Sequence, residues 1–292
     1  MQDNHEASHL AIPALFTHAG RCWRRHLKQL WWIVLGILVP VTLLNMIGGH
    51  LDQEFFADLS WLSLLLRYGS KLLLVVAWMA VLLISAAWME GKDFSLREAF
   101  NTAGDRYIPG GLAFLAAYLA RVAGLALIGL LAFSLPGDSS LRSLLLLLGV
   151  PLLAVALMMW VSIAPFLTVI GGRPIGAALR VSAHIASLHW RAVSGLLLLL
   201  TVLQGIVSLL VWYVSSVVDA GVAQFALSSG FSFYGSTALR IAILLPVRMV
   251  PDITLLYALT VFTVFFVNRR TEWGLLGDES PKADEGMMGD AE

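Results

Sequence analysis

The sequence has little charge and almost no cysteine, and both shortages restrict what the protein can be. Charged residues make up 13% of the 292 residues, against roughly a quarter in a soluble domain. Hydrophobic residues make up 59%, and the mean hydropathy is +0.82. This composition excludes an ordinary soluble domain and indicates an integral membrane protein. The single cysteine, Cys22, excludes an internal disulfide.

The sequence also lacks the short motifs of common enzymes. No phosphate-binding loop (G-x-x-x-x-G-K-[ST]), hydrolase elbow (G-x-S-x-G) or C-x-x-C pair occurs. No Asp or Glu lies in the middle of an apolar run, so an intramembrane hydrolase would have no acid or base. The 19 basic and 19 acidic residues cancel, which argues against a nucleic-acid partner. We therefore expect no enzyme activity, catalytic residue or cofactor.

Long apolar runs are what the sequence does contain. A helix needs about 20 mostly apolar residues to cross about 30 Å of hydrocarbon. Six runs come close to this length and predict an all-α, polytopic membrane protein with six transmembrane helices. The runs are 30–47, 72–89, 108–133, 144–170, 192–217 and 253–267. We expect the first to be an uncleaved anchor, because the ten residues before the amphipathic region include acids and no cleavage site follows.

The approach to the last run is irregular. Pro246 and Pro251 would each remove a helix hydrogen bond, so we expect a break near Pro251 with Asp252 capping the helix that restarts. The stretch 237–251 is apolar but too short to span. It is either a periplasmic surface helix or a re-entrant segment, and interrupted helices are where transporters build substrate sites.

Three amphipathic segments, each followed by a pair of apolar runs, indicate an internal threefold repeat. They cover about 10–28, 95–107 and 174–191. Each contains a related motif, L-F-x-x-A, A-F-x-x-A or A-L-x-x-S, which ends at Ala19, Ala103 and Ser182 respectively. The repeat predicts three units, each an interfacial helix followed by a membrane hairpin.

A basic amphipathic helix lies among lipid headgroups, with aromatic residues at the boundary and cations toward anionic lipid. We therefore expect membrane lipids as partners. The candidate membrane-interface residues are Trp23, Phe100, Tyr107, Arg180, Trp190 and Arg191. These helices either seat the hairpins only, or also dock a cytoplasmic protein partner.

Orientation follows from the loop cations. Twelve Lys and Arg residues lie on the side of the amphipathic segments and five on the other side, which places both termini in the cytoplasm. Residues 1–273 form the membrane domain. Residues 274–292 are acidic and lack aromatic side chains, and they predict a disordered cytoplasmic tail.

Arg121 is the one charged residue inside an apolar run. It lies near the middle of the third run, where an ionised side chain costs several kcal/mol unless it is compensated. Gln204 lies at comparable depth in the fifth run. Arg121 is either a structural donor between helices, to Gln204 or to a carbonyl near a proline, or a ligand-binding residue that grips an anionic group such as a lipid phosphate. The candidate ligand-binding residues are Arg121 and Gln204.

His18, Cys22 and His26 follow one another at helical spacing, and these residue types can bind zinc. The first and last are about 12 Å apart along a helix axis, so they cannot surround one ion. We expect no metal site.

The six-span layout and the motif Ala178, Leu179, Ser182, Trp190, Arg191 before the fifth run, echoed by Ser95, Ala99, Phe100 and Tyr107, resemble a bacterial family. This family comprises the membrane domain of some glycerophosphodiester phosphodiesterases and related stand-alone six-span inner-membrane proteins. The resemblance covers about residues 16–270. The catalytic phosphodiesterase domain has no counterpart here, so the resemblance implies an inner-membrane fold and a link to lipid or envelope processes, without the enzymatic activity.

The sequence thus leads to two functional hypotheses. The first is a non-enzymatic inner-membrane protein that acts as an accessory or scaffold in envelope or lipid physiology. The alternative is a permease for a lipid or a small anionic solute, such as the membrane subunit of an ABC system. Neither the substrate nor the oligomeric state follows from the sequence.

The topology is testable with reporter fusions. A fusion after Gly91 should report the cytoplasm and a fusion after Gly137 the periplasm, because the loop cations collect on the side of the amphipathic segments. A cytoplasmic signal after Gly137 would overturn the hairpin scheme.

Overall fold

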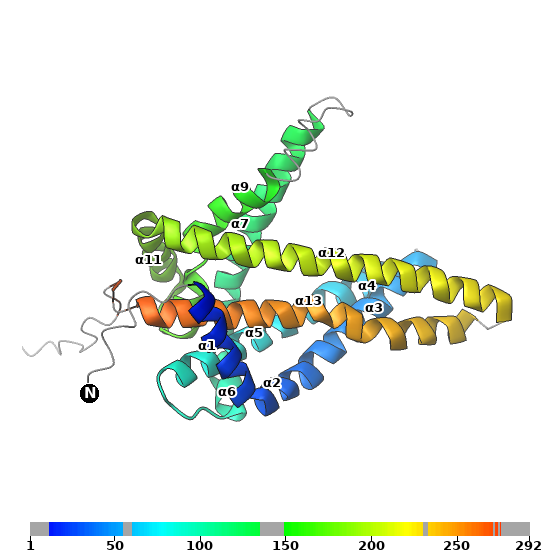
Figure 1. The fold of residues 1–292 in the computed structure, drawn as a ribbon, viewed down its shortest axis with the longest axis horizontal. Helices are drawn as coiled ribbons and strands as arrows, with labels where there is room; N and C mark the ends of the chain where they lie inside the picture. Colours follow the sequence, from blue (N-terminus) through cyan, green and yellow to red (C-terminus); the bar gives the residue numbers. More distant parts are fainter. Residues whose placement is uncertain are drawn as a thin grey trace, which may run out of the picture.

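The chain is an all-helical membrane protein in the part that the computed structural model describes, which is residues 12–54, 60–134, 149–229, 233–270, 272–273 and 275 (Figure 1). Six helical stretches are long and apolar enough to cross a membrane, as the sequence predicts. They are Leu27–Gly49, Ser70–Met89, Tyr107–Gly124, Leu152–Val169, Trp190–Phe225 and Ala238–Arg269. The predicted acidic tail lies outside the described residues, apart from Leu275.

The spans pair into three antiparallel hairpins. The first hairpin comprises α2 (Leu27–Ile33), η2 (Val34–Leu38) and α3 (Val39–Glu54), followed by α4 (Ser60–Leu64), η4 (Leu65–Gly69) and α5 (Ser70–Met89). The second comprises α7 (Tyr107–Phe133), α9 (Val150–Val161) and α10 (Ala164–Val169), and the third α12 (Trp190–Ser229) and α13 (Phe233–Arg269). A short helix precedes each hairpin: α1 (Ile12–Arg25), α6 (Leu96–Asp105) and α11 (Ile175–Leu188).

The second span of each hairpin forms the centre of the molecule. In the most apolar 18-residue stretch of each of these three spans, more than half of the residues are buried (61, 56 and 56%), against 39, 22 and 22% in the first spans. Helix α5 contacts both α10 and α13, and the Phe166 ring of α10 stacks on Phe262 of α13 at 4.8 Å between centroids. The first spans therefore form an outer layer around an inner set of three.

Each amphipathic helix packs on the second span of another hairpin, and the three contacts form a closed series. Helix α6 packs on α5, α11 packs on α9 and α10, and α1 packs on α13. The last residues of the three sequence motifs, Ala19, Ala103 and Ser182, are all fully buried. The motif therefore marks the packing face of each helix, where a small side chain lets two helices approach closely. That the three units are copies of one another stays a prediction.

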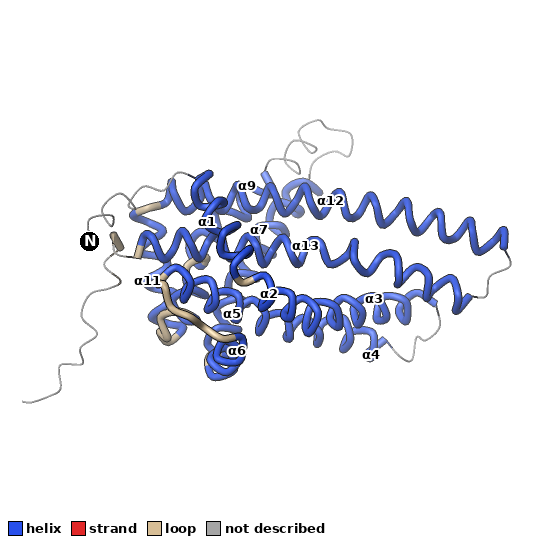
Figure 2. Tube along the Cα trace, turned by 60° about the horizontal axis from the view of Figure 1, so that its bottom comes forward, coloured by secondary structure: helices blue, strands red, loops and turns tan. Residues whose placement is uncertain are grey.

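The amphipathic helices gather at the end of the molecule where α12 begins and α13 ends (Figures 1 and 2). Helix α6 starts with the predicted capping box: the Ser95 hydroxyl accepts from the Glu98 N–H at 3.2 Å, and the Glu98 carboxylate accepts from the Ser95 N–H at 2.8 Å. At the opposite end, α12 and α13 extend beyond the other helices as a pair. There Asp219 of α12 lies 3.9 Å from both Arg240 and Arg248 of α13.

The predicted break near Pro251 is wrong. Helix α13 continues through both prolines, and residues 237–251 belong to it rather than to a separate surface helix or re-entrant segment. Helix α13 packs along both α12 and α5, and its side chains Leu244 and Leu256 are each 1% exposed. This packing stabilises the helix although each proline removes one backbone hydrogen bond. Asp252 therefore does not cap a helix. It lies inside a candidate span, near the cationic Lys71 of α5, which corrects the expectation that the spans contain no acid.

An ion-pair cluster ties the ends of α5 and α13 together. The Glu90 carboxylate, just after α5, accepts hydrogen bonds of 2.6 Å from both Arg270 and Lys92. Partial burial opposes ionisation of Glu90, but the hydrogen bonds from Lys92 and Arg270 outweigh it and hold its pKa below the ordinary value. The Glu90–Arg270 pair links two segments that are 180 residues apart in the chain.

Replacing Glu90 with Gln should lower stability in detergent at neutral pH by about 1–3 kcal/mol, because a charged hydrogen-bonded partner is lost. The folded-state pKa of Glu90 is lowered, so its contribution is present above the ordinary carboxyl pKa and is lost as the pH falls through the folded value. Melting curves from pH 7 to pH 3 should show the gap between wild type and variant closing in acid. A constant gap would contradict this account. Asp93→Asn, at an exposed side chain 4.0 Å from Arg25, should change nothing.

The α7–α9 contact depends on Gly124. A Cβ atom there would lie 2.8 Å from Ala154 Cα, in the backbone of α9. Gly124→Ala should therefore force the two helices apart and lower stability by about 1–3 kcal/mol. The matched control is Gly205→Ala in α12, where a Cβ meets nothing within 4 Å, so its melting temperature should hold or rise slightly. Equal melting temperatures for the two variants would show that α7 and α9 do not pack this closely.

Candidate functional site

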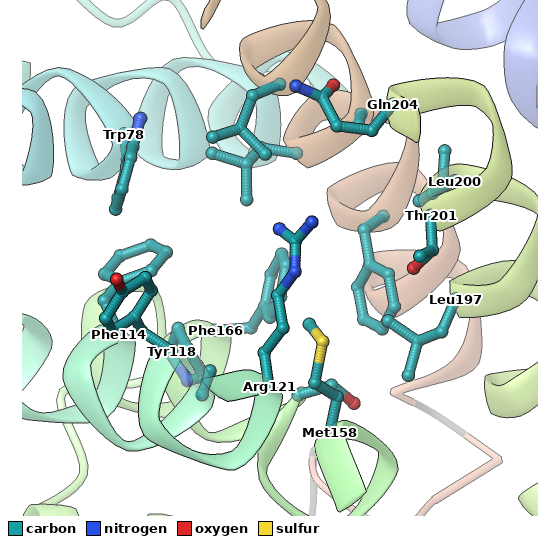
Figure 3. A pocket seen from close by; sticks show the side chains of 17 residues that line it. Trp78, Phe114, Tyr118, Arg121, Met158, Phe166, Leu197, Leu200, Thr201 and Gln204 are labelled. Atoms are coloured by element: carbon teal, nitrogen blue, oxygen red, sulfur yellow. The ribbon is translucent and has the colours of Figure 1, made fainter. Parts of the chain in front are cut away.

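A pocket of about 200 Å³ lies where the second hairpin meets α5 and the third hairpin (Figure 3). Five of the six candidate spans contribute to its wall. Most lining side chains are apolar, and Arg121 is the only charged residue among them. The principal lining residues are Trp78, Phe114, Tyr118, Arg121, Met158, Phe166, Leu197, Leu200, Thr201 and Gln204.

The two residues predicted as ligand-binding candidates line this same pocket. Arg121 and Gln204 each lie fourteen residues past the first residue of their helices, α7 and α12. The sequence places them at equal depth by this count, and the structure brings them to one cavity from two different hairpins. Whether they bind a ligand stays a prediction.

Arg121 has no protein partner in the part of the chain that the structure describes. Its side chain extends into the pocket toward the wall that carries Gln204 (Figure 3). It makes no hydrogen bond and no ion pair with the described residues, and it is exposed. A guanidinium group carries five N–H donors, so the pocket contains a set of donors that the described protein does not satisfy.

Only one of the two polar atoms of the Gln204 side chain has a hydrogen-bond partner among the described residues. Its amide nitrogen donates to the Pro251 carbonyl oxygen at 3.0 Å. Its Oε1 atom has no hydrogen-bond partner among the described residues, so it does not accept from Arg121, and Nε1 of Trp78 is unpaired as well. Both residues line the pocket, but these two atoms are themselves buried and do not face the cavity. Arg121 is therefore the polar group that the pocket offers to a ligand.

The fourth span is interrupted beside the pocket. Helix α9 ends at Val161 and α10 begins at Ala164, because Pro165 lacks the N–H that would continue the ladder. Ser182 of α11 repairs the break: its hydroxyl donates to the Trp160 carbonyl at 2.9 Å and accepts from the Ile163 N–H at 3.3 Å. The sequence predicted a single span over 144–170 and named Pro165 as one place where helix carbonyls could be freed. Ser162 and Pro165, within the break, line the pocket.

The six predicted interface residues divide into two groups. Three of them contact other parts of the protein: the Trp23 indole donates to Thr260 Oγ1 at 3.0 Å, Tyr107 donates to the Leu72 carbonyl at 3.3 Å, and the half-buried Phe100 packs against a core cluster. The other three, Arg180, Trp190 and Arg191, are exposed. Arg191 lies over the Trp190 ring, 5.4 Å from its centroid. These three exposed side chains are therefore free to contact lipid headgroups, as the sequence predicts.

The His18, Cys22 and His26 stripe does not form a site. Cys22 is 1% exposed, and burial raises the pKa of its thiol to about 11. His18 Nδ1 contacts the Ala14 carbonyl at 2.9 Å, and His26 Nδ1 contacts Gln29 at 3.0 Å. Among the described residues, no three His, Cys, Asp or Glu side chains come together.

Sequence reasoning missed Trp78 as a pocket residue, and it missed the role of Ser182 at the break. Trp78 lies in a continuous apolar run, where a tryptophan that packs in the core and a tryptophan that lines a pocket look the same. Pro165 was a signal for the break, but the hydroxyl that stabilises it comes from α11, which is distant in the sequence.

Comparison of the chain with protein-family models, with curated proteins and with solved structures found no match.

Proposed function

We propose that this chain is a non-enzymatic integral protein of the bacterial inner membrane that acts in lipid or envelope physiology by holding an anionic ligand in the Arg121 pocket. The observation that carries the proposal is the guanidinium group of Arg121, which has no partner among the described residues and lies in a mostly apolar pocket. An ionised arginine within a span is costly and is retained where it pairs with a charge or a substrate.

The neighbourhood of Arg121 supports a ligand rather than a structural role. A structural arginine would donate to the amide oxygen or carbonyls around it, but Gln204 Oε1 has no partner and the Pro251 carbonyl is taken by Gln204. No described carboxylate lines the pocket. The electrostatic potential of the cavity is therefore positive, and the compensating charge has to come from outside the described protein.

Several features support an inner-membrane protein built from three related units with both termini in the cytoplasm. The closed series of contacts between amphipathic helices and second spans is what three copies of one unit would give. The cations of α1 and α11 lie at the end of the molecule where the amphipathic helices gather. Membership of the stand-alone family related to the phosphodiesterase membrane domain is part of this proposal.

A permease is the second candidate, and the interrupted fourth span favours it. Transporters commonly bind substrates where a spanning helix is broken, and the break at Ser162 and Ile163 borders the pocket. Helix α11, held to the break by Ser182, would then be the docking point for a cytoplasmic ATPase. Copurification of an ATPase that is lost in Ser182→Ala would favour the permease over the accessory role.

Arg121→Leu tests the claim that both candidate functions share, which is that Arg121 holds an anionic ligand. If Arg121 holds an anionic ligand, the variant should keep its folded yield and should melt at the same or a higher temperature in detergent, because leucine suits the bilayer and a charge within a membrane span is removed. It should also fail to support the envelope function of the wild type in a growth assay. Arg97→Leu, at an exposed side chain on α6, is the matched control and should keep the phenotype.

Two outcomes would count against this function. A loss of stability of about 1–3 kcal/mol in Arg121→Leu would assign Arg121 a structural role. A stable and fully functional variant would show that Arg121 has neither role.

A further inference from the structure

We propose that the ligand is an anionic phospholipid, which enters the pocket sideways from the bilayer. This inference rests on the proposed function, because it takes the Arg121 pocket as a ligand site. It specifies the chemical class of the ligand, its route of entry and the contacts of its head group.

The position of the pocket argues for entry from lipid. Its walls on α12 and α13 run from Leu197 to Gln204 and from Leu255 to Phe262, about 10–21 Å along the helices from their Trp190 and Arg269 ends. These stretches lie inside candidate spans. A water-soluble solute would need a polar path to this depth, and no charged residue other than Arg121 lines the pocket.

The open side of the pocket lies on the outer face of α7. Arg121 is exposed and Tyr118 is 59% exposed, although both line the cavity. The residues beside them on the same helix, Leu115, Leu119 and Val122, are also exposed. An apolar helix face of this kind contacts acyl chains in a membrane. A head group can therefore enter between lipid-facing side chains while its chains stay in the bilayer.

The size of the pocket fits a head group without its chains. An apolar cavity of about 150 Å³ can hold a benzene ring. A cavity of about 200 Å³ therefore takes a phosphate with a small polyol, but not two acyl chains.

Arg121 defines the chemistry of the head group. It supplies one positive charge, which matches the single negative charge of a phosphodiester, and its planar N–H donors bind phosphate oxygens in pairs. A choline head carries a compensating cation, so phosphatidylcholine offers no net charge to Arg121.

The test measures lipid retention by native mass spectrometry on the full-length protein. The probes are phosphatidylglycerol, phosphatidylcholine and a fatty acid of equal chain length, together with the soluble glycerol phosphate. Wild type should retain phosphatidylglycerol about tenfold more strongly than the other probes. Arg121→Gln should abolish this preference, because it removes the positive charge that pairs with the phosphodiester.

A control variant distinguishes lipid bound in the pocket from lipid that adheres to the outer surface of the protein. Trp212→Phe replaces a tryptophan of α12 that is 68% exposed and does not line the pocket, and it should leave retention unchanged. Melting curves of all variants check that each is folded.

The remaining outcomes distinguish the two proposals. If glycerol phosphate binds as well as the lipid and its binding needs Arg121, the proposed function stands and the lipid assignment is overturned. If the fatty acid or phosphatidylcholine is retained as strongly as phosphatidylglycerol, the head-group assignment is overturned. If no anion depends on Arg121 in a folded variant, both proposals fail.

Discussion

The structure depends on one constraint, which is that polar groups inside a bilayer have to be satisfied by the protein itself. Helices satisfy most backbone groups, and named side chains satisfy the exceptions. Ser182 bonds both sides of the break in the fourth span, and Gln204 donates to the carbonyl of Pro251. Against this background the unpaired guanidinium group of Arg121 stands out, because the same constraint predicts a partner for it.

The same constraint explains how the helices associate. Apolar side chains gain little by leaving lipid for another helix, so association depends on close packing and on interhelical hydrogen bonds. Ala19, Ala103 and Gly124 provide the close contacts. The hydrogen bonds of Trp23 to Thr260 and of Tyr257 to the Phe16 carbonyl hold α1 on α13. The position of the amphipathic helices thus follows from their small and polar residues, and their cations are left at the surface.

Much of the fold follows from the sequence because membrane spans are set by length and hydropathy. The six spans and the equal depth of Arg121 and Gln204 come from counting residues along apolar runs. Features that depend on partners distant in the chain do not follow. Pro251 and Pro165 carry the same local signal, yet α13 continues through the first and the fourth span breaks before the second. The difference lies in what packs beside each proline, and the place of Trp78 on the pocket wall is hidden for the same reason.

The most direct test of the account is a cryo-electron microscopy map of the protein in nanodiscs that contain anionic phospholipid. The account predicts non-protein density within hydrogen-bond distance of the Arg121 guanidinium group, with an extension that leaves the pocket across the exposed face of α7. A map in which Arg121 pairs with a carboxylate or a carbonyl of the protein itself, with no such density in the pocket, would contradict it.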